Sequence, residues 1–270
     1  MISSGVSIAM MLVLIFLSMC TYHDVVAYMP SYRVINRSHH RHHPISKTVT
    51  TLSHATTKPL SATNVSDGTI INESPRTLLQ KGMQAFRSLD VPSSLTYFDQ
   101  ADALANGGLS PYLWQRGISY YYLDEFQKGS QQFKSDVINN PLDVEEIVWD
   151  IACLARIRND NTKEWPPQTT MELPKGKRDR RKIMSTVYSL FRGNGMTEHD
   201  LFKAGHDGNI SDKFYSLFYL GLYCETRNET TKAEEYMKLA AKSKYATGIG
   251  SGDYMSSCAK VHCKLRGWEV

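Results

Sequence analysis

Few residues of this chain have types and spacing that could carry chemistry. Cys258 and His262 lie one helical turn apart, so their side chains would share a helix face and could ligate a metal ion. No second pair of ligand residues lies near them in the sequence, and core packing is the favoured interpretation. The glycine-rich segment from Gly248 to Gly252 resembles a phosphate-binding loop but lacks the GK[ST] ending, so we interpret it as a connection between helices.

A second set of polar residues resembles the start of a calcium-binding loop. Asp207, Asn209 and Ser211 have the spacing of its first ligands. Asp212 and Phe218, however, stand where such a loop needs a glycine and a bidentate glutamate. The sequence also lacks the GxSxG and HExxH patterns of hydrolases. We therefore predict no catalytic residues, no metal site and no cofactor.

Charge is distributed unevenly along the chain. Before residue 67 there are five Lys and Arg but one acid, Asp24, whereas the rest holds 26 bases and 26 acids from totals of 31 and 27. A neutral body lacks the basic footprint of a nucleic-acid-binding protein, so no nucleic-acid partner is predicted. The densest basic run, KGKRDRRK at 175–182, is typical of a solvated segment, with contact to an acidic partner or lipid headgroups as the alternative.

The N-terminal residues have the composition of targeting segments. The apolar run 8–17 is too short to span a bilayer and predicts a signal peptide over residues 1–27, leaving no integral membrane segment after cleavage. Residues 28–72 are rich in Ser, Thr and His, carry no acid up to Ser66, and are expected to be a disordered, transit-peptide-like leader. The His-rich tract HHRHHP within it is interpreted as compositional.

A signal peptide followed by such a leader resembles the bipartite presequences of algae with complex plastids, in which an aromatic residue follows the signal cleavage site. Here Ala27-Tyr28 supplies that junction, with Tyr in place of the common Phe. The resemblance implies delivery to a plastid through the secretory pathway. Two alternatives stay open: secretion or an endomembrane lumen, with N-glycosylation sequons such as Asn209, and a lipobox ending in Cys20, for which Met19 is too large.

The body contains an internal repeat. Gly82 and Gly117 lie 35 residues apart, as do Phe98 and Phe133, and a third copy begins around Gly221. Such spacing is typical of helix-turn-helix repeats, which stack into a surface. Apolar periodicity predicts helices over 74–89, 93–104, 110–141 (two helices), 144–157, 180–191, from 197, within 214–247 and over 253–265, with a basic loop at 158–182. Four body cysteines fall inside these helices and are expected to be buried thiols.

These repeats resemble the tetratricopeptide repeat (TPR) family. The positions that match its signature in order are Gly117, Tyr120, Phe126, Gly129, Phe133 and Pro141. The resemblance, to bacterial lipoprotein-type TPR adaptors and plastid TPR-like proteins, implies an all-α domain at 73–267. This would be a short solenoid of paired antiparallel helices, with repeats at about 75–108, 110–143 and 214–247 and a capping helix at 253–265. It implies scaffolding and brings no catalytic residues.

In TPR stacks the first helix of each repeat lines the concave face, which here is aromatic and aliphatic and lacks the Lys and Asn of carboxylate clamps. The residues predicted to bind a partner on this face are Leu79, Met83, Phe86, Trp114, Ile118, Tyr121, Tyr122, Tyr215 and Phe218. They would suit an apolar or amphipathic segment of a protein partner of unknown identity. The alternative is internal core covered by the helix from Asp253 or the one from Arg180.

The predicted function is therefore a non-enzymatic TPR adaptor or scaffold in a plastid, with homo-oligomerisation possible. A secreted or membrane-anchored TPR scaffold is the first alternative. An unrecognised enzyme or small-molecule binder is the second, and the motifs do not favour it.

Overall fold

The computed structural model describes residues 73–158 and 165–270. The predictions made for residues 1–72, including the signal peptide, the leader, the lipobox and the His-rich tract, lie outside this part of the chain. The described residues form helices joined by turns and loops without any strand, so the fold class is all-α, as predicted. None of the described helices combines the length and the apolar composition needed to cross a membrane.

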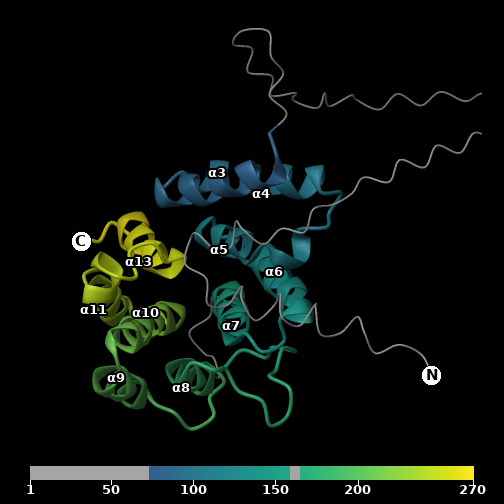
Figure 1. Ribbon diagram of the computed structural model, residues 1–270. Helices are drawn as coiled ribbons and strands as arrows, with labels where there is room; N and C mark the ends of the chain where they lie inside the picture. The colour runs from purple at the N-terminus through teal and green to yellow at the C-terminus, as the bar shows by residue number, and fades with distance from the viewer. Residues whose placement is uncertain (1–72, 159–164) are drawn as a thin grey trace, which may run out of the picture. The chain divides into compact units, whose positions relative to one another are not determined.

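The helices follow one another with short connections, apart from the loop between α7 and α8 (Figure 1). In chain order they are α3 (Pro75–Arg87), α4 (Val91–Leu104), the 3-10 turn η1 (Ser110–Tyr112), α5 (Trp114–Tyr122), α6 (Phe126–Asn139), α7 (Val144–Arg158), α8 (Lys182–Phe191), α9 (Glu198–Asp207), α10 (Ile210–Thr226), α11 (Thr230–Ala241), α12 (Lys244–Thr247) and α13 (Tyr254–Leu265). Each α-helix contacts the next along the chain. The last helix, α13, also contacts α3, the first.

Capping residues decide several helix starts. Thr197 and Asn209 each form a capping box with the acid three residues later, Asp200 and Asp212. The helix start at Thr197 was predicted. The box at Asn209 starts α10 at Ile210, earlier than the expected start at Phe214, and it explains the calcium-like spacing as a helix cap.

The expected helix start at Ser110 is wrong. Ser110–Tyr112 forms the 3-10 turn η1, and α5 begins only at Trp114. The reason is the backbone of Leu113 between them, whose φ of −101° and ψ of 47° lie outside the helical region. At the other end of this helix pair, α6 ends at Asn139, one residue before the expected Asn140-Pro141 stop.

One packing contact recurs in three helix pairs. A Cβ added to Gly82 of α3 would lie 2.7 Å from the ring of Phe98 in α4, and one added to Gly117 of α5 would lie 2.7 Å from Phe133 in α6. In the third pair, Gly221 of α10 would meet Met237 of α11 at 3.0 Å. The sequence separation between glycine and partner is the same in all three, so each glycine admits its neighbour at the same place.

The turn inside each of these pairs also recurs. The residue seven positions after each glycine has a positive φ, of 69° at Leu89, 58° at Asp124 and 60° at Asn228. The next residue then donates its N–H to the carbonyl five residues earlier, at 2.9, 3.0 and 2.9 Å, in the pairs Asp90 to Ala85, Glu125 to Tyr120 and Glu229 to Cys224. This left-handed turn closes the first helix and starts the second immediately.

The interior centres on aromatic packing around Trp149 of α7. Its ring lies 5.1 Å from that of Tyr121 and stacks on Phe133 at 6.2 Å, and it also contacts Phe218 at 6.2 Å between ring centroids. One side chain thus joins α5, α6, α7 and α10 in one core. The four described cysteines are buried thiols, as predicted.

Candidate functional site

The predicted partner-binding face lies largely inside the protein. Six of its residues are buried: Met83, Phe86, Ile118, Tyr121, Tyr122 and Phe218. The other three are half-buried: Leu79, Trp114 and Tyr215. These side chains contact other side chains of the same chain. The alternative interpretation, in which they form internal core, predicts this placement.

The helix α13 covers part of this face. The ring of Tyr254, its first residue, stacks on Phe86 at 5.2 Å and meets Trp114 edge-on at 5.3 Å. Tyr215 donates its hydroxyl to Asp253, the N-cap of α13, at 2.8 Å. A partner could reach the covered residues only after α13 moves away. We call these nine residues the aromatic face.

A buried ionic cluster around Glu225 fastens α13 to the aromatic face. Tyr121 donates its hydroxyl to Glu225 Oε2 at 2.7 Å, and Arg266 donates its Nε–H to Oε1 at 2.6 Å. His262 Nε2 lies 3.5 Å from the same carboxylate, and its Nδ1 lies 3.0 Å from the Tyr122 hydroxyl. Both ring nitrogens of His262 therefore face groups of this cluster.

The pKa values of His262 and Glu225 are both lowered in this cluster, for different reasons. Burial lowers the pKa of His262 to about 4, although Glu225 pulls it upward. Burial alone would raise the pKa of Glu225, but His262 and Arg266 outweigh it and lower that pKa to about 2. Near neutral pH the cluster therefore holds a neutral imidazole beside a carboxylate that is ionised and paired with Arg266.

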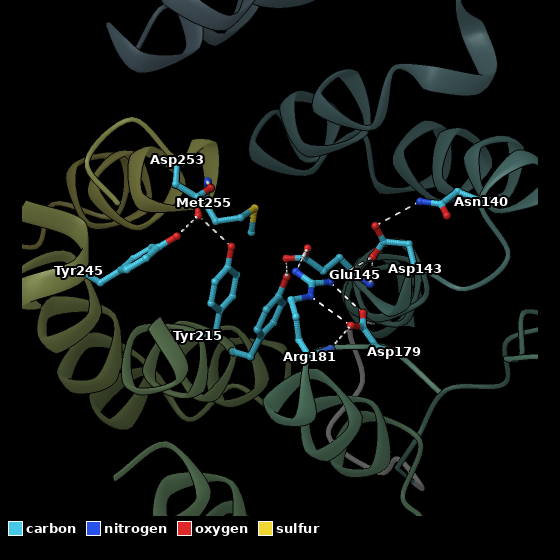
Figure 2. Close-up of polar contacts among 10 residues, drawn as sticks. Asn140, Asp143, Glu145, Asp179, Arg181, Tyr215, Tyr245, Asp253 and Met255 are labelled. Atoms are coloured by element: carbon cyan, nitrogen blue, oxygen red, sulfur yellow. Dashed lines mark hydrogen bonds and ion pairs between the residues drawn. The ribbon is translucent and has the colours of Figure 1, made fainter. Parts of the chain in front are cut away.

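A second polar network surrounds Arg181, in the loop before α8 (Figure 2). Its guanidinium donates to Glu145 Oε2 at 2.7 Å and to Asp179 Oδ2 at 2.8 Å, and it lies 3.6 Å from Asp143. Glu145 also accepts the hydroxyl of Tyr219 at 2.6 Å. One cation thus connects the loop to α7 and, through Glu145, to α10.

Two of the acids drawn in Figure 2, Asp143 and Asp253, also cap helices. Asp143 accepts the N–H of Glu145 at 2.9 Å, near the start of α7, and Asp253 accepts that of Met255 at 2.9 Å in α13. Burial raises the pKa of Asp143 to about 6, and Glu145 adds to the shift while Arg181 opposes it. Tyr245, like Tyr215, donates its hydroxyl to Asp253, at 2.9 Å (Figure 2). These contacts identify the network as a structural joint between helices.

The basic run 175–182 has two kinds of residue. Asp179 is buried and Arg181 is partly buried in the network just described. The remaining charged residues of the run are exposed, namely Lys175, Lys177, Arg178, Arg180 and Lys182. The sequence carried one signal for this buried pair, namely a single acid inside a run of bases. The whole run had been predicted to be solvated.

One further group has the geometry of a metal site. Ligand atoms of Glu198, Cys224 and Glu229 lie within 4.8 Å of one another. The ammonium of Lys232, however, lies 2.8 Å from Glu229 and 3.3 Å from Glu198. A lysine already supplies the positive charge that these carboxylates face, so the group is satisfied as an ion-pair cluster.

Comparison with known proteins adds no identity, because no protein family, curated protein or solved structure matches the chain. The function is therefore inferred from two surfaces, the aromatic face beneath α13 and the exposed cations of the basic run.

Proposed function

We propose that this protein is a non-enzymatic, TPR-like adaptor that binds a segment of another protein. The observation that carries the proposal is the recurrence of one glycine contact and one left-handed turn in the pairs α3/α4, α5/α6 and α10/α11. Helix pairs that repeat in this way stack on one another and offer extended surfaces to partners. In this proposal the pairs form a short α-solenoid, and α13 is its terminal cap.

The closed position of α13 restricts how such an adaptor could work. The aromatic face was the predicted site for an apolar or amphipathic segment, and six of its nine residues are buried. Binding there would have to displace the contacts of Tyr254 and the Glu225 cluster, which costs free energy. We therefore place the first contact of the partner on exposed residues, with the aromatic face as part of the scaffold.

We further propose that the adaptor acts in a plastid, on the strength of the acid-free segment that follows Ala27-Tyr28. Residues 1–72 fused to a fluorescent protein should enter a complex plastid in an algal host. A matched fusion of residues 1–27 alone should stay in the secretory pathway. Accumulation of the longer fusion in the medium would instead favour the secreted scaffold.

The adaptor proposal is tested by proximity labelling with the full chain in its native compartment. The labelling enzyme is fused after Val270, which is 48% exposed. We expect a small, reproducible set of proteins to be labelled above a control in which the same fusion carries Tyr121→Ala, a change in the core. Two results together would contradict the adaptor function and favour a ligand-binding protein. Both fusions would label the same proteins equally, and a small molecule would co-purify only with the protein that lacks the Tyr121→Ala change.

A further inference from the structure

The exposed part of the basic run carries charge that the described protein does not neutralise. Across residues 73–158 and 165–270, the side chains of Lys175, Lys177, Arg178, Arg180 and Lys182 form no ion pair or hydrogen bond. The nearest acids in the sequence are already engaged, since Asp179 pairs with Arg181 and Glu172 pairs with Arg192. We call these five residues the basic patch.

The backbone that carries the basic patch is fixed at two points. At one end Lys177 donates its N–H to the carbonyl of Pro174 at 2.8 Å, in a turn where Gly176 has a φ of 74°. At the other end the backbone N–H of Arg181 donates to Asp179 Oδ1 at 2.8 Å, and the Arg181 guanidinium is bound to Glu145. A charged surface on a fixed backbone loses less conformational entropy on binding than a disordered tail does.

We propose that the basic patch is the docking surface for an acidic segment, rich in Asp and Glu, of the protein partner. This inference rests on the proposed adaptor function and states the chemistry of its partner. Two of the five cations are arginines, whose planar guanidinium groups match carboxylates with two parallel hydrogen bonds. Charge complementarity also speeds association, because a basic surface on a body whose charges sum to zero gives the approaching acidic segment a preferred site of encounter.

Two other anionic partners fit the patch less well. Single-stranded nucleic acid needs aromatic side chains between the cations for base stacking, and residues 175–182 contain none. A membrane surface needs a second signal beside a basic cluster for stable attachment, usually an apolar one. The apolar residues before the patch do not supply it, since Met171 is buried and Leu173 is half-buried. An acidic peptide segment needs neither feature.

The first test measures binding of a synthetic peptide in which Asp and Glu alternate with Ser, by fluorescence anisotropy with the full chain. The patch variant is Lys175→Glu/Lys177→Glu/Arg178→Glu. The matched control is Lys242→Glu/Lys244→Glu/Lys264→Glu, which changes net charge equally at three other exposed lysines. We expect the patch variant to bind about tenfold more weakly and the control to change affinity less than about twofold at physiological salt.

Several outcomes would overturn the inference. Equal weakening by both variants would mean that net charge or the basic leader binds the peptide. Tight binding of an Asn and Gln version of the peptide would mean that charge is not recognised. Stronger, patch-dependent binding to phosphatidylserine vesicles or to a single-stranded oligonucleotide would assign the patch to a membrane or to nucleic acid.

The second test separates this inference from the adaptor function itself. The proximity-labelling experiment is repeated with the patch variant and with its matched control. Loss of the labelled partner in the patch variant alone supports the inference. If both variants label the same partner as the unmodified chain, the adaptor stands and the patch is not its docking surface. If the unmodified chain labels no protein, the adaptor fails, and the acidic segment fails with it as a natural ligand.

Discussion

The aromatic face and the basic patch are both regions in which side chains could bind a partner, and they differ in what they face. Burying a large apolar side chain stabilises the fold by about 1.5–3 kcal/mol, so rings such as Phe86 and Tyr122 gain by packing against α13. A lysine gains nothing by burial unless a carboxylate meets it, so the patch stays in water. Arg181 shows the intermediate case, since three acids meet it.

The basic run 175–182 thus has two roles. Two of its residues, Asp179 and Arg181, hold the fold together, and the others stay on the surface. Arg180 and Arg181 are adjacent, and only Arg181 has partners in the described structure. Exposure, more than residue type, decides which side chains are available to a partner.

Tyr121→Ala should produce the largest loss of stability. The ring is fully buried among Tyr122, Phe126 and Trp149, and the hydroxyl donates to Glu225. Removing it leaves a cavity and an unpaired carboxylate oxygen, at a cost of about 3–5 kcal/mol in the free energy of unfolding. Chemical denaturation followed by circular dichroism measures this cost.

The matched control for that change is Tyr112→Ala, since Tyr112 is 45% exposed. Its stability should change by less than about 0.5 kcal/mol. Equal stabilities for the two variants would mean that the ring of Tyr121 does not lie in the core beside Phe126 and Trp149.

Arg181→Ala should be the next most damaging change. It would leave the buried Asp179 and the half-buried Glu145 without their common cation, and breaking such a pair costs about 3 kcal/mol. The neighbouring Arg180→Ala removes an exposed cation and should change the free energy of unfolding by less than about 0.5 kcal/mol. Thermal melting of the two variants compares them directly, and a milder effect at Arg181 than at Arg180 would contradict the network of Figure 2.

The sequence was sufficient where structure depends on near neighbours. The 35-residue spacing related Gly82 to Gly117 and Phe98 to Phe133, and each glycine lies against the Phe of its own repeat. Most helix boundaries were predicted to within a few residues, because caps and proline stops are local signals. Where a cap was missed, at Asn209, the start of α10 was misplaced.

The sequence was insufficient where distant segments meet. Arg87 in α3 donates to Ser257 in α13 at 3.0 Å, across 170 residues, and no periodicity encodes that return. The inward position of Arg181 likewise depends on Glu145, which lies 36 residues earlier. Periodicity placed the candidate binding residues on their helices, but it could not decide between an open face and the alternative of internal core beneath the helix from Asp253.

Mild acid should loosen the aromatic face through His262. Its pKa in the folded protein, about 4, lies below the usual value of 6.5, so protonation favours the unfolded state. The stability it contributes is complete above pH 6.5 and is lost as the pH falls from about 6.5 to about 4. Between pH 7 and pH 5 this loss amounts to about 2 kcal/mol.

The comparison of wild type with His262→Gln isolates this effect in urea unfolding at pH 5 and pH 7. Burial raises the pKa of Asp136 to about 8 and that of Asp143 to about 6, which acts in the opposite direction, but both acids are present in both chains. The lowered pKa of Glu225, about 2, places its own contribution below this window. We expect the variant to lose less stability on acidification than the wild type, and parallel pH profiles would refute the buried, neutral imidazole.

Gly176→Ala should have the smallest effect on stability and should act on the basic patch. Gly176 has open space around it and a φ of 74°, so alanine would be strained by its backbone conformation alone, at about 1 kcal/mol. Gly252 is the matched control, because it also has open space but lacks a positive φ, and alanine there should be neutral or slightly stabilising. The strain at Gly176 should loosen the turn between Lys175 and Lys177, so acidic-peptide binding should weaken by about twofold while the melting temperature falls only slightly. A variant that keeps full peptide affinity would show that the patch binds through its charge alone, without help from the fixed turn.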